Sequence, residues 1–190
     1  MSDQSIDRTR LPIRRPPFRG VVNDTLDGSQ PDWEHVAPIR APDGAPNVLL
    51  VLTDDAGFGN PSGFGGPVRT PTLDRLAGGG VSYNRFRTTA LCSPTRAALM
   101  SARNHHAVGF GMVGEFAGPF PGYTAMLPKT CQLFPKTLQG NGYSTACFGK
   151  WHLTPDSQQG LGGPFDRWPN ALGFDYFWGF LGGESGQFDP

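Results

Sequence analysis

Three short stretches of the chain carry residue types that can do chemistry, and the first is CSPTR at residues 92–96. Ser93 can cap a helix and Pro94 suits the first helical position, so the sequence predicts a helix that begins here. A helix N-terminus presents unpaired N–H groups and a partial positive charge, which favour a group that becomes anionic during a reaction. Cys92 is therefore a candidate nucleophile. The alternative is that Cys92 has no chemical role and packs at the helix end as a small apolar residue.

The second stretch is the pair of adjacent carboxylates Asp54 and Asp55, which follows the apolar run NVLLVLT. Carboxylate oxygens are hard ligands that suit Ca²⁺ or Mg²⁺. Two neighbouring acids repel each other, and a bound cation is an economical way to hold them together. The simpler alternative is that one of the two carboxylates caps a loop, the other is solvated, and no metal binds. We treat the pair as a candidate metal site.

The third stretch is GKWH, in which Lys150 and His152 lie two residues apart on a predicted strand and so point to one face. The intrinsic pKa of histidine suits proton transfer near neutral pH. Arg96 belongs with them, because a cation in the first turn of a helix is disfavoured unless an anion is nearby. Each residue alone could be an ordinary surface residue, but their combination predicts a functional site.

The elements that must position these residues alternate between strands and helices. The apolar run at 47–53 predicts a strand buried on both faces, and a second strand is predicted to start at about residue 143. The other expected elements are a helix from Thr70 and Pro71 to Gly78, a strand at 81–89, the helix that begins near Cys92, and a helix over 132–142 that Gly140 and Gly142 end. This order predicts an α/β domain with a mostly parallel sheet, in which ligands bind at the carboxyl ends of the strands.

The segment RWPNALGFDYFWGFLGGES that follows is dense in aromatic and glycine residues. We expect its aromatic side chains to pack in the core or in loops. They are Trp168, Phe174, Tyr176, Phe177 and Trp178.

Composition excludes several classes of function. The chain has 190 residues and a formal net charge of zero, so bulk electrostatics recruits neither nucleic acid nor an anionic membrane. The run Val48–Leu52 is far shorter than the roughly 18 apolar residues of a membrane span. No signal peptide is evident, so we expect a cytoplasmic protein, with the periplasm left open.

The three cysteines lack zinc-ligand spacing, which argues against a structural zinc site. Residues 1–46 are rich in proline and arginine, and we expect an extended arm.

Together these stretches resemble the sulfatase family of the alkaline-phosphatase-like superfamily. DDAGFG at 54–59 resembles the family's metal-binding turn, and CSPTR matches its Cys-x-Pro-x-Arg signature. TPTLDRLAGGGVSYNRF resembles a linking segment of the family, and GYSTACFGKWHL resembles the segment with its Lys-x-His pair. The resemblance covers residues 47 to about 185 and is best to bacterial arylsulfatases. It implies an alkaline-phosphatase-like sandwich of helices around a mostly parallel sheet, of which this chain is the N-terminal part.

The resemblance also implies a cofactor chemistry and a set of site residues. In the family, a formylglycine-generating or sulfatase-maturating enzyme converts the cysteine of this signature, here Cys92, to formylglycine (3-oxoalanine). The hydrated aldehyde attacks the sulfur of a small-molecule sulfate ester, and elimination then releases inorganic sulfate. The implied metal residues are Asp54, Asp55 and the modified Cys92, which hold Ca²⁺ or Mg²⁺. Arg96 stabilises the oxyanion, Lys150 bridges nucleophile and sulfate, and His152 assists deprotonation.

The chain departs from the family in what it lacks. A further histidine, an Asp-Asn pair and a second lysine, which complete the family's site, have no counterparts within the 190 residues. We therefore expect this piece alone to bind metal weakly and to have little or no activity. Two rival functions stay open at this point: a phosphodiesterase or phosphonate monoester hydrolase of the same superfamily, and a non-catalytic α/β binding module. His105 and His106 are expected to have a structural role.

Overall fold

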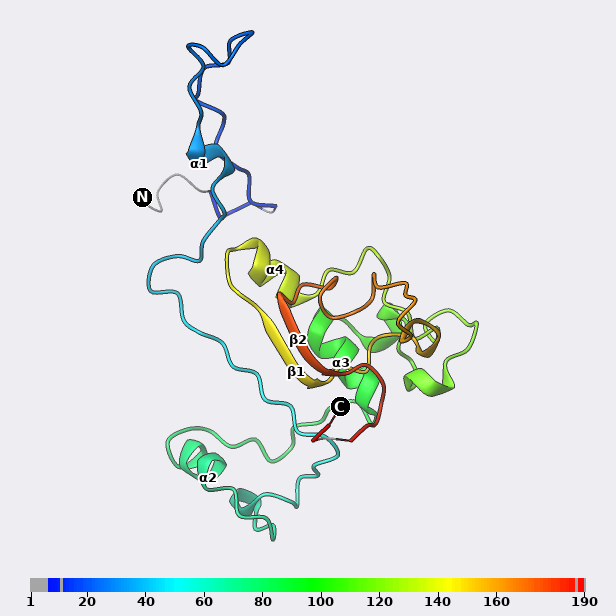
Figure 1. The fold of residues 1–190 in the computed structure, drawn as a ribbon. Coiled ribbons are helices and arrows are strands. Elements are labelled where there is room, and N and C mark those ends of the chain that lie inside the picture. Colours follow the sequence, from blue (N-terminus) through cyan, green and yellow to red (C-terminus); the bar gives the residue numbers. More distant parts are fainter. Residues whose placement is uncertain (1–6, 11, 187, 190) are drawn as a thin grey trace.

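The computed structural model describes residues 7–10, 12–186 and 188–189. Its main body contains the helices α3 (Cys92–Ser101) and α4 (Phe134–Gly140) and the strands β1 (Ala146–Lys150) and β2 (Tyr176–Phe180), shown in Figure 1. Two further helices, α1 (Trp33–Val36) and α2 (Pro71–Gly78), lie outside this body. The 3-10 turns are η2 (Ser62–Phe64), η3 (His105–Val108), η4 (Gly114–Phe116) and η5 (Asp156–Gln158).

The sheet consists of β1 and β2, which run parallel with Ala146 opposite Tyr176 and Lys150 opposite Phe180. This confirms the predicted α/β class with a parallel sheet. β2 was not predicted, because a glycine interrupts its aromatic run and hides the strand pattern. Gly179 is required at its place, since a Cβ there would overlap the backbone of Gly149 on β1. The pairing continues beyond β1, where the Trp151 amide donates to the Phe180 carbonyl at 3.0 Å.

The core lies between α3, the sheet and the loops that follow them. Trp151 and Leu153, just after β1, are almost fully buried, and the Trp151 ring meets Phe174 edge to face with centroids 5.8 Å apart. Ala97 is the residue of α3 that enters this core, and it is completely buried. The remaining members of the cluster are Val108, Phe110, Ala125, Leu127 and Leu133. This packing fixes α3 against the carboxyl end of β1.

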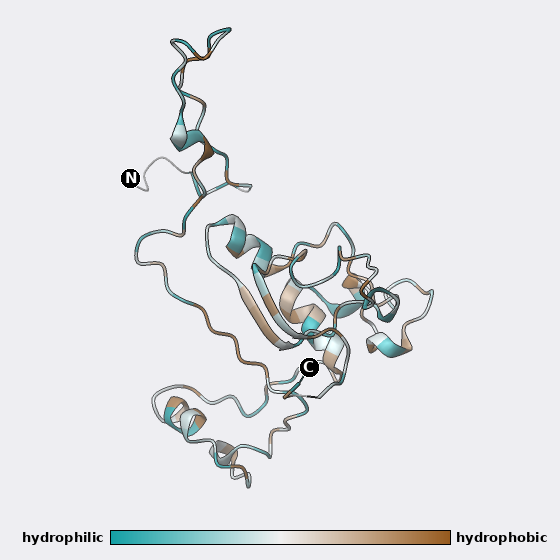
Figure 2. Cartoon of the chain, in the orientation of Figure 1, coloured by the Kyte–Doolittle hydropathy of each residue, from teal (hydrophilic) through white to brown (hydrophobic). Residues whose placement is uncertain are grey.

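The predicted strand at 47–53 is wrong for this structure. The segment is extended, but no ladder forms, and Leu49 and Val51 are 88% and 74% exposed. The apolar residues of this segment appear brown along the stretch that runs beside the body in Figure 2. A groove of about 720 Å³ separates the segment from β1. A strand needs a neighbour about 4.8 Å away, and none of the described residues takes that place.

The predicted strand at 81–89 is also not formed, since the described backbone there has only bends and irregular structure. The predicted helix before it is confirmed as α2, with Thr70 before it and Pro71 as its first residue. Thr70 does not cap through its side chain; its hydroxyl instead lies 3.0 Å from the hydroxyl of Ser62. Residues 81–88 are exposed, so their alternating side chains have no core face to pack on, and alternation alone does not produce a strand.

The described part of residues 7–46 forms an arm that reaches away from the body and carries α1 (Figure 1). It is tied to the body near α4, where the Ala41 amide donates to the Gly142 carbonyl at 3.2 Å. The Arg8 guanidinium donates to the carbonyls of Arg40 and Asn141. Across the described residues, no helix has both the length and the apolar content that crossing a membrane requires.

Candidate functional site

Cys92 is the first residue of α3, and its thiol is a free, half-buried group. The predicted cap is wrong, because Leu91 occupies the N-cap position without a side-chain hydrogen bond and Ser93 lies inside the helix. The Ser93 hydroxyl is completely buried and accepts a hydrogen bond from the Gly114 amide at 2.9 Å. Ser93 thus tethers η4 to the helix that carries Cys92.

Replacing Ser93 by alanine should lower the free energy of unfolding by about 1 kcal/mol, because the Gly114 amide loses its acceptor. Urea unfolding of the complete protein measures the change. Ser82→Ala is the matched control, since Ser82 is exposed. Equal stability of the two variants would show that the tether contributes nothing.

Lys150 ends β1 beside Asp54, with Nζ 2.8 Å from a carboxylate oxygen. Only 9% of the Lys150 side chain is exposed, so the lysine of this ion pair is largely shielded from solvent. Arg96 donates from Nη1 to the Lys150 carbonyl, which joins α3 to the end of β1. Three residues predicted from separate stretches of sequence therefore meet at one end of the groove.

Burial lowers the pKa of Arg96, and the nearby Asp54 and Cys92 oppose this effect. The Arg96 Nε atom is buried and has no hydrogen-bond partner among the described residues. A guanidinium cannot lose its proton at physiological pH, so this donor is available to an anion. Burial also raises the pKa of the neighbouring Cys147 thiol to about 11. Cys147 therefore stays a thiol at neutral pH and is a poor nucleophile.

His152 lies two residues past β1, and 3% of it is exposed. Its amide donates to the Leu181 carbonyl at 3.1 Å, and its backbone is left-handed at φ 57°. The Nε2 atom lies 2.8 Å from Oε1 of Glu115 in η4. Burial lowers the pKa of His152, the Glu115 carboxylate opposes this, and the cations Lys150 and Arg96 add to the lowering. His152 is therefore neutral at neutral pH.

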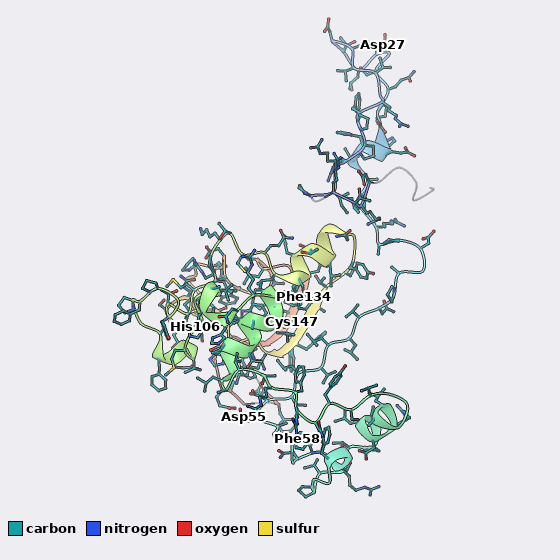
Figure 3. The ribbon with its side chains drawn as sticks, turned by 180° about the vertical axis from the view of Figure 1, so that it is seen from behind. Asp27, Asp55, Phe58, His106, Phe134 and Cys147 are labelled. Carbon is teal, nitrogen blue, oxygen red and sulfur yellow. The ribbon has the colours of Figure 1, made fainter. Side chains whose placement is uncertain are left out.

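Asp55 is the predicted site residue that the structure does not bring into this network. It is exposed, with a left-handed backbone at φ 50°, and lies beside the body, where Figure 3 labels it. Asp54 and Asp55 have the oxygen chemistry that Ca²⁺ or Mg²⁺ requires. Ca²⁺ takes about 6 to 8 oxygen ligands, whereas the described residues contain no group of three or more candidate ligands. The residues present do not by themselves fit the metal.

Titration of the 190-residue chain with Ca²⁺ in a calorimeter should therefore show only weak binding, in the millimolar range or above. Two carboxylates, one of them already paired with Lys150, provide too few ligands for a tight site. Asp54→Asn should change the titration little. Micromolar affinity would contradict this expectation.

No sequence motif includes Glu115, and the structural role expected of His105 and His106 stays a prediction. Glu115 is a single acid in a glycine-rich loop, and no spacing rule links it to His152. His105 donates from Nδ1 to the Phe110 carbonyl at 2.8 Å, and the ring of His106 meets Tyr123 edge to face. These contacts order the loop after α3.

Comparison with known proteins adds independent information. The family model of sulfatases matches residues 46–190. The chain is 40% identical over 141 residues to human steryl-sulfatase, covering 70% of this chain and 23% of that protein. It is 39% identical over 131 residues to human N-acetylgalactosamine-6-sulfatase, covering 65% and 25%. An uncharacterised sulfatase of Schizosaccharomyces pombe is 36% identical over 152 residues, covering 75% and 26%.

A solved structure is also similar. The crystal structure of Ps i-CgsB aligns with a TM-score of 0.51 and 31% sequence identity, covering 68% of this chain and 27% of the other. The chain spans about a quarter of the length of the curated relatives it matches. The family match covers the segment that carries Asp54, Cys92, Arg96, Lys150 and His152. The chain belongs to the sulfatase family.

Proposed function

We propose that this chain forms part of an enzyme that hydrolyses a sulfate monoester to an alcohol or phenol and inorganic sulfate, with Cys92 as the precursor of the nucleophile. The observation that carries the proposal is the position of Arg96. It lies one helical turn after Cys92 on α3 and is half-buried, and its Nε–H is buried without a partner among the residues described. A buried, unpaired cationic donor next to a free thiol fits the binding of an anionic oxygen.

Conversion of Cys92 to formylglycine fits this place in the fold. The residue is half-buried rather than sealed in the core, and it stands first in a ten-residue helix. A modifying enzyme of the formylglycine-generating or sulfatase-maturating class is the partner that this proposal requires. When formed, the modified residue supplies a hydrated aldehyde, whose hydroxyl attacks sulfur and which later releases sulfate without a second attack on it.

The chain's own residues bind the substrate and move protons. Arg96 holds an oxygen at the nucleophilic position, and Lys150 contributes a second positive charge next to it. A sulfate ester is an anion, so two cations in a partly dry site favour its binding. His152, neutral at neutral pH, is the group that accepts a proton.

The proposal includes a divalent metal ion and a class of substrate. Asp54 and Asp55 would be two of the oxygen ligands of Ca²⁺ or Mg²⁺, and the described residues do not complete the ligand set. We propose a small aryl sulfate as the substrate, because most of the residues that line the groove beside Lys150 are apolar or aromatic.

The test uses the complete protein, co-produced with a formylglycine-generating enzyme and assayed with nitrophenyl sulfate and with the corresponding nitrophenyl phosphodiester. A larger kcat/KM for the sulfate is the expected result. A larger kcat/KM for the phosphodiester would assign the protein to the phosphodiesterases of the same superfamily. Turnover of neither compound, with Cys92 modified, would contradict hydrolysis of small aryl esters.

A further inference from the structure

The 3-10 turn η4 places an acidic side chain directly against the histidine of the candidate site. Glu115 Oε1 lies 2.8 Å from His152 Nε2, and the carboxylate is 41% exposed while the histidine is almost fully buried. The two atoms are within hydrogen-bond distance, although the ring N–H is not aligned with the carboxylate oxygen. None of the motifs in the sequence includes this residue.

A carboxylate can only accept a proton, so the contact is favourable when Nε2 carries the proton. A neutral imidazole has one protonated nitrogen, and the other nitrogen, Nδ1, then holds the lone pair. The Nδ1 atom is buried and meets no hydrogen-bond partner in the described part of the chain. Glu115 thus selects the tautomer in which the free lone pair is on Nδ1.

Two further contacts hold this arrangement in place. The Gly114 amide, next to Glu115, donates to the buried Ser93 hydroxyl, so the turn is anchored beside Cys92. On the other side Gly183 leaves room for the pair, because a Cβ at that position would overlap Glu115 Oε1 and lie 2.8 Å from His152 Cε1. The Ser93 contact on one side and Gly183 on the other therefore hold the Glu115 carboxylate next to the His152 ring.

We propose that Glu115 is a positioning residue that keeps the proton of His152 on Nε2 and so makes Nδ1 the atom that accepts a proton during the reaction. In that step the O–H bond of the hydroxyl on the modified Cys92 breaks and an N–H bond forms at Nδ1, so the ring becomes an imidazolium beside the Glu115 carboxylate. The electron pair left on oxygen forms the C=O bond while the C–O bond to the departing sulfate breaks. The proton then leaves to solvent. This inference rests on the proposed function for the role of His152, but the contact itself does not.

The first readout is independent of activity. In the complete protein labelled with ¹³C and ¹⁵N in histidine, the signal assigned to His152 by its loss in His152→Asn should report protonation at Nε2. Glu115→Gln removes the negative charge that raises the pKa of His152, while Lys150 and Arg96 continue to lower it. The titration midpoint of His152 should therefore fall by about half a pH unit or more, and the tautomer should become mixed. An unchanged midpoint and tautomer would overturn the proposal.

The second readout is the kinetics of the matured enzyme. Glu115→Gln should lower kcat by about 10- to 100-fold with a smaller change in KM, the loss that follows when a histidine loses its orienting carboxylate. The acidic limb of the kcat/KM profile should move to lower pH. The matched control Glu34→Gln, an exposed residue of α1, should behave as the unchanged protein. A lower kcat without a shift of the limb would show a merely structural role.

Gly183→Ala keeps every charge but forces the carboxylate away from the ring. It should reproduce the loss in kcat and the mixed tautomer, and it keeps the proposal testable if Glu115→Gln does not fold. Normal kcat in Gly183→Ala together with an unchanged His152 signal would contradict the inference. If the unchanged protein cleaves no sulfate ester, the proposed function fails, whereas the histidine signals still decide the role of Glu115.

Discussion

Replacing Cys92 by alanine should lower kcat for nitrophenyl sulfate in the complete, matured protein by more than about 10³-fold. Alanine cannot be converted to the aldehyde, while its small side chain fits the first position of α3 and the fold should persist. Cys92→Ser should be equally inactive where the modifying enzyme accepts only cysteine. Steady-state kinetics measures the loss.

Mass spectrometry supplies the chemical control. Trypsin releases residues 88–96 as one peptide, and its mass in the active protein should be about 18 Da below that of the unmodified peptide. Cys131→Ala is the matched variant, since Cys131 is also free and half-buried but lies outside the candidate site. It should keep both the activity and the mass change. An active protein with an unmodified Cys92 thiol, or an active Cys92→Ala variant, would contradict the proposed mechanism.

Replacing Arg96 by alanine should lower kcat by about 10²- to 10³-fold, the loss expected when one oxyanion donor is removed from a water-poor site. The same change removes the donor to the Lys150 carbonyl, so the end of β1 loses its link to α3. Arg96→Lys should recover a small part of the activity, because it restores the charge but not the planar donor pair. Initial rates over a range of substrate concentrations separate kcat from KM.

The matched control for Arg96 is Arg103→Ala. Arg103 is an exposed residue just beyond α3 and is not among the residues that line the groove. Its substitution should leave kcat and KM unchanged. If Arg96→Ala retained kcat within about twofold of the unchanged protein, Arg96 would have no part in stabilising the reacting oxygen.

Local sequence signals predicted the helices well. Pro71 at the start and Gly78 at the end predicted α2, and Gly140 predicted the end of α4, since these residues set the local backbone directly. The strands were harder to predict. The apolar run at 47–53 has a clear strand pattern, yet it remains an exposed extended segment. A strand exists only with a hydrogen-bonded neighbour, and no local pattern specifies which segment provides it.

The same distinction applies to the site. Cys92, Arg96, Lys150 and His152 stand out in the sequence because their types and spacing match a known motif set. Their shared location depends on the parallel pairing of β1 with β2 and on the packing of α3 against it. Glu115 has no such pattern and becomes visible only through its distance to His152.

The sequence by itself determined the family, the helix that begins at Cys92 and the residue types available for chemistry, because these depend on motifs and on neighbours along the chain. Tertiary structure alone decided that Lys150 pairs with Asp54 and that His152 is buried against Glu115. It also decided that Ser93 anchors a turn rather than capping a helix. Such contacts join residues up to 96 positions apart. They depend on packing and on the burial of charge, which act through space rather than along the chain.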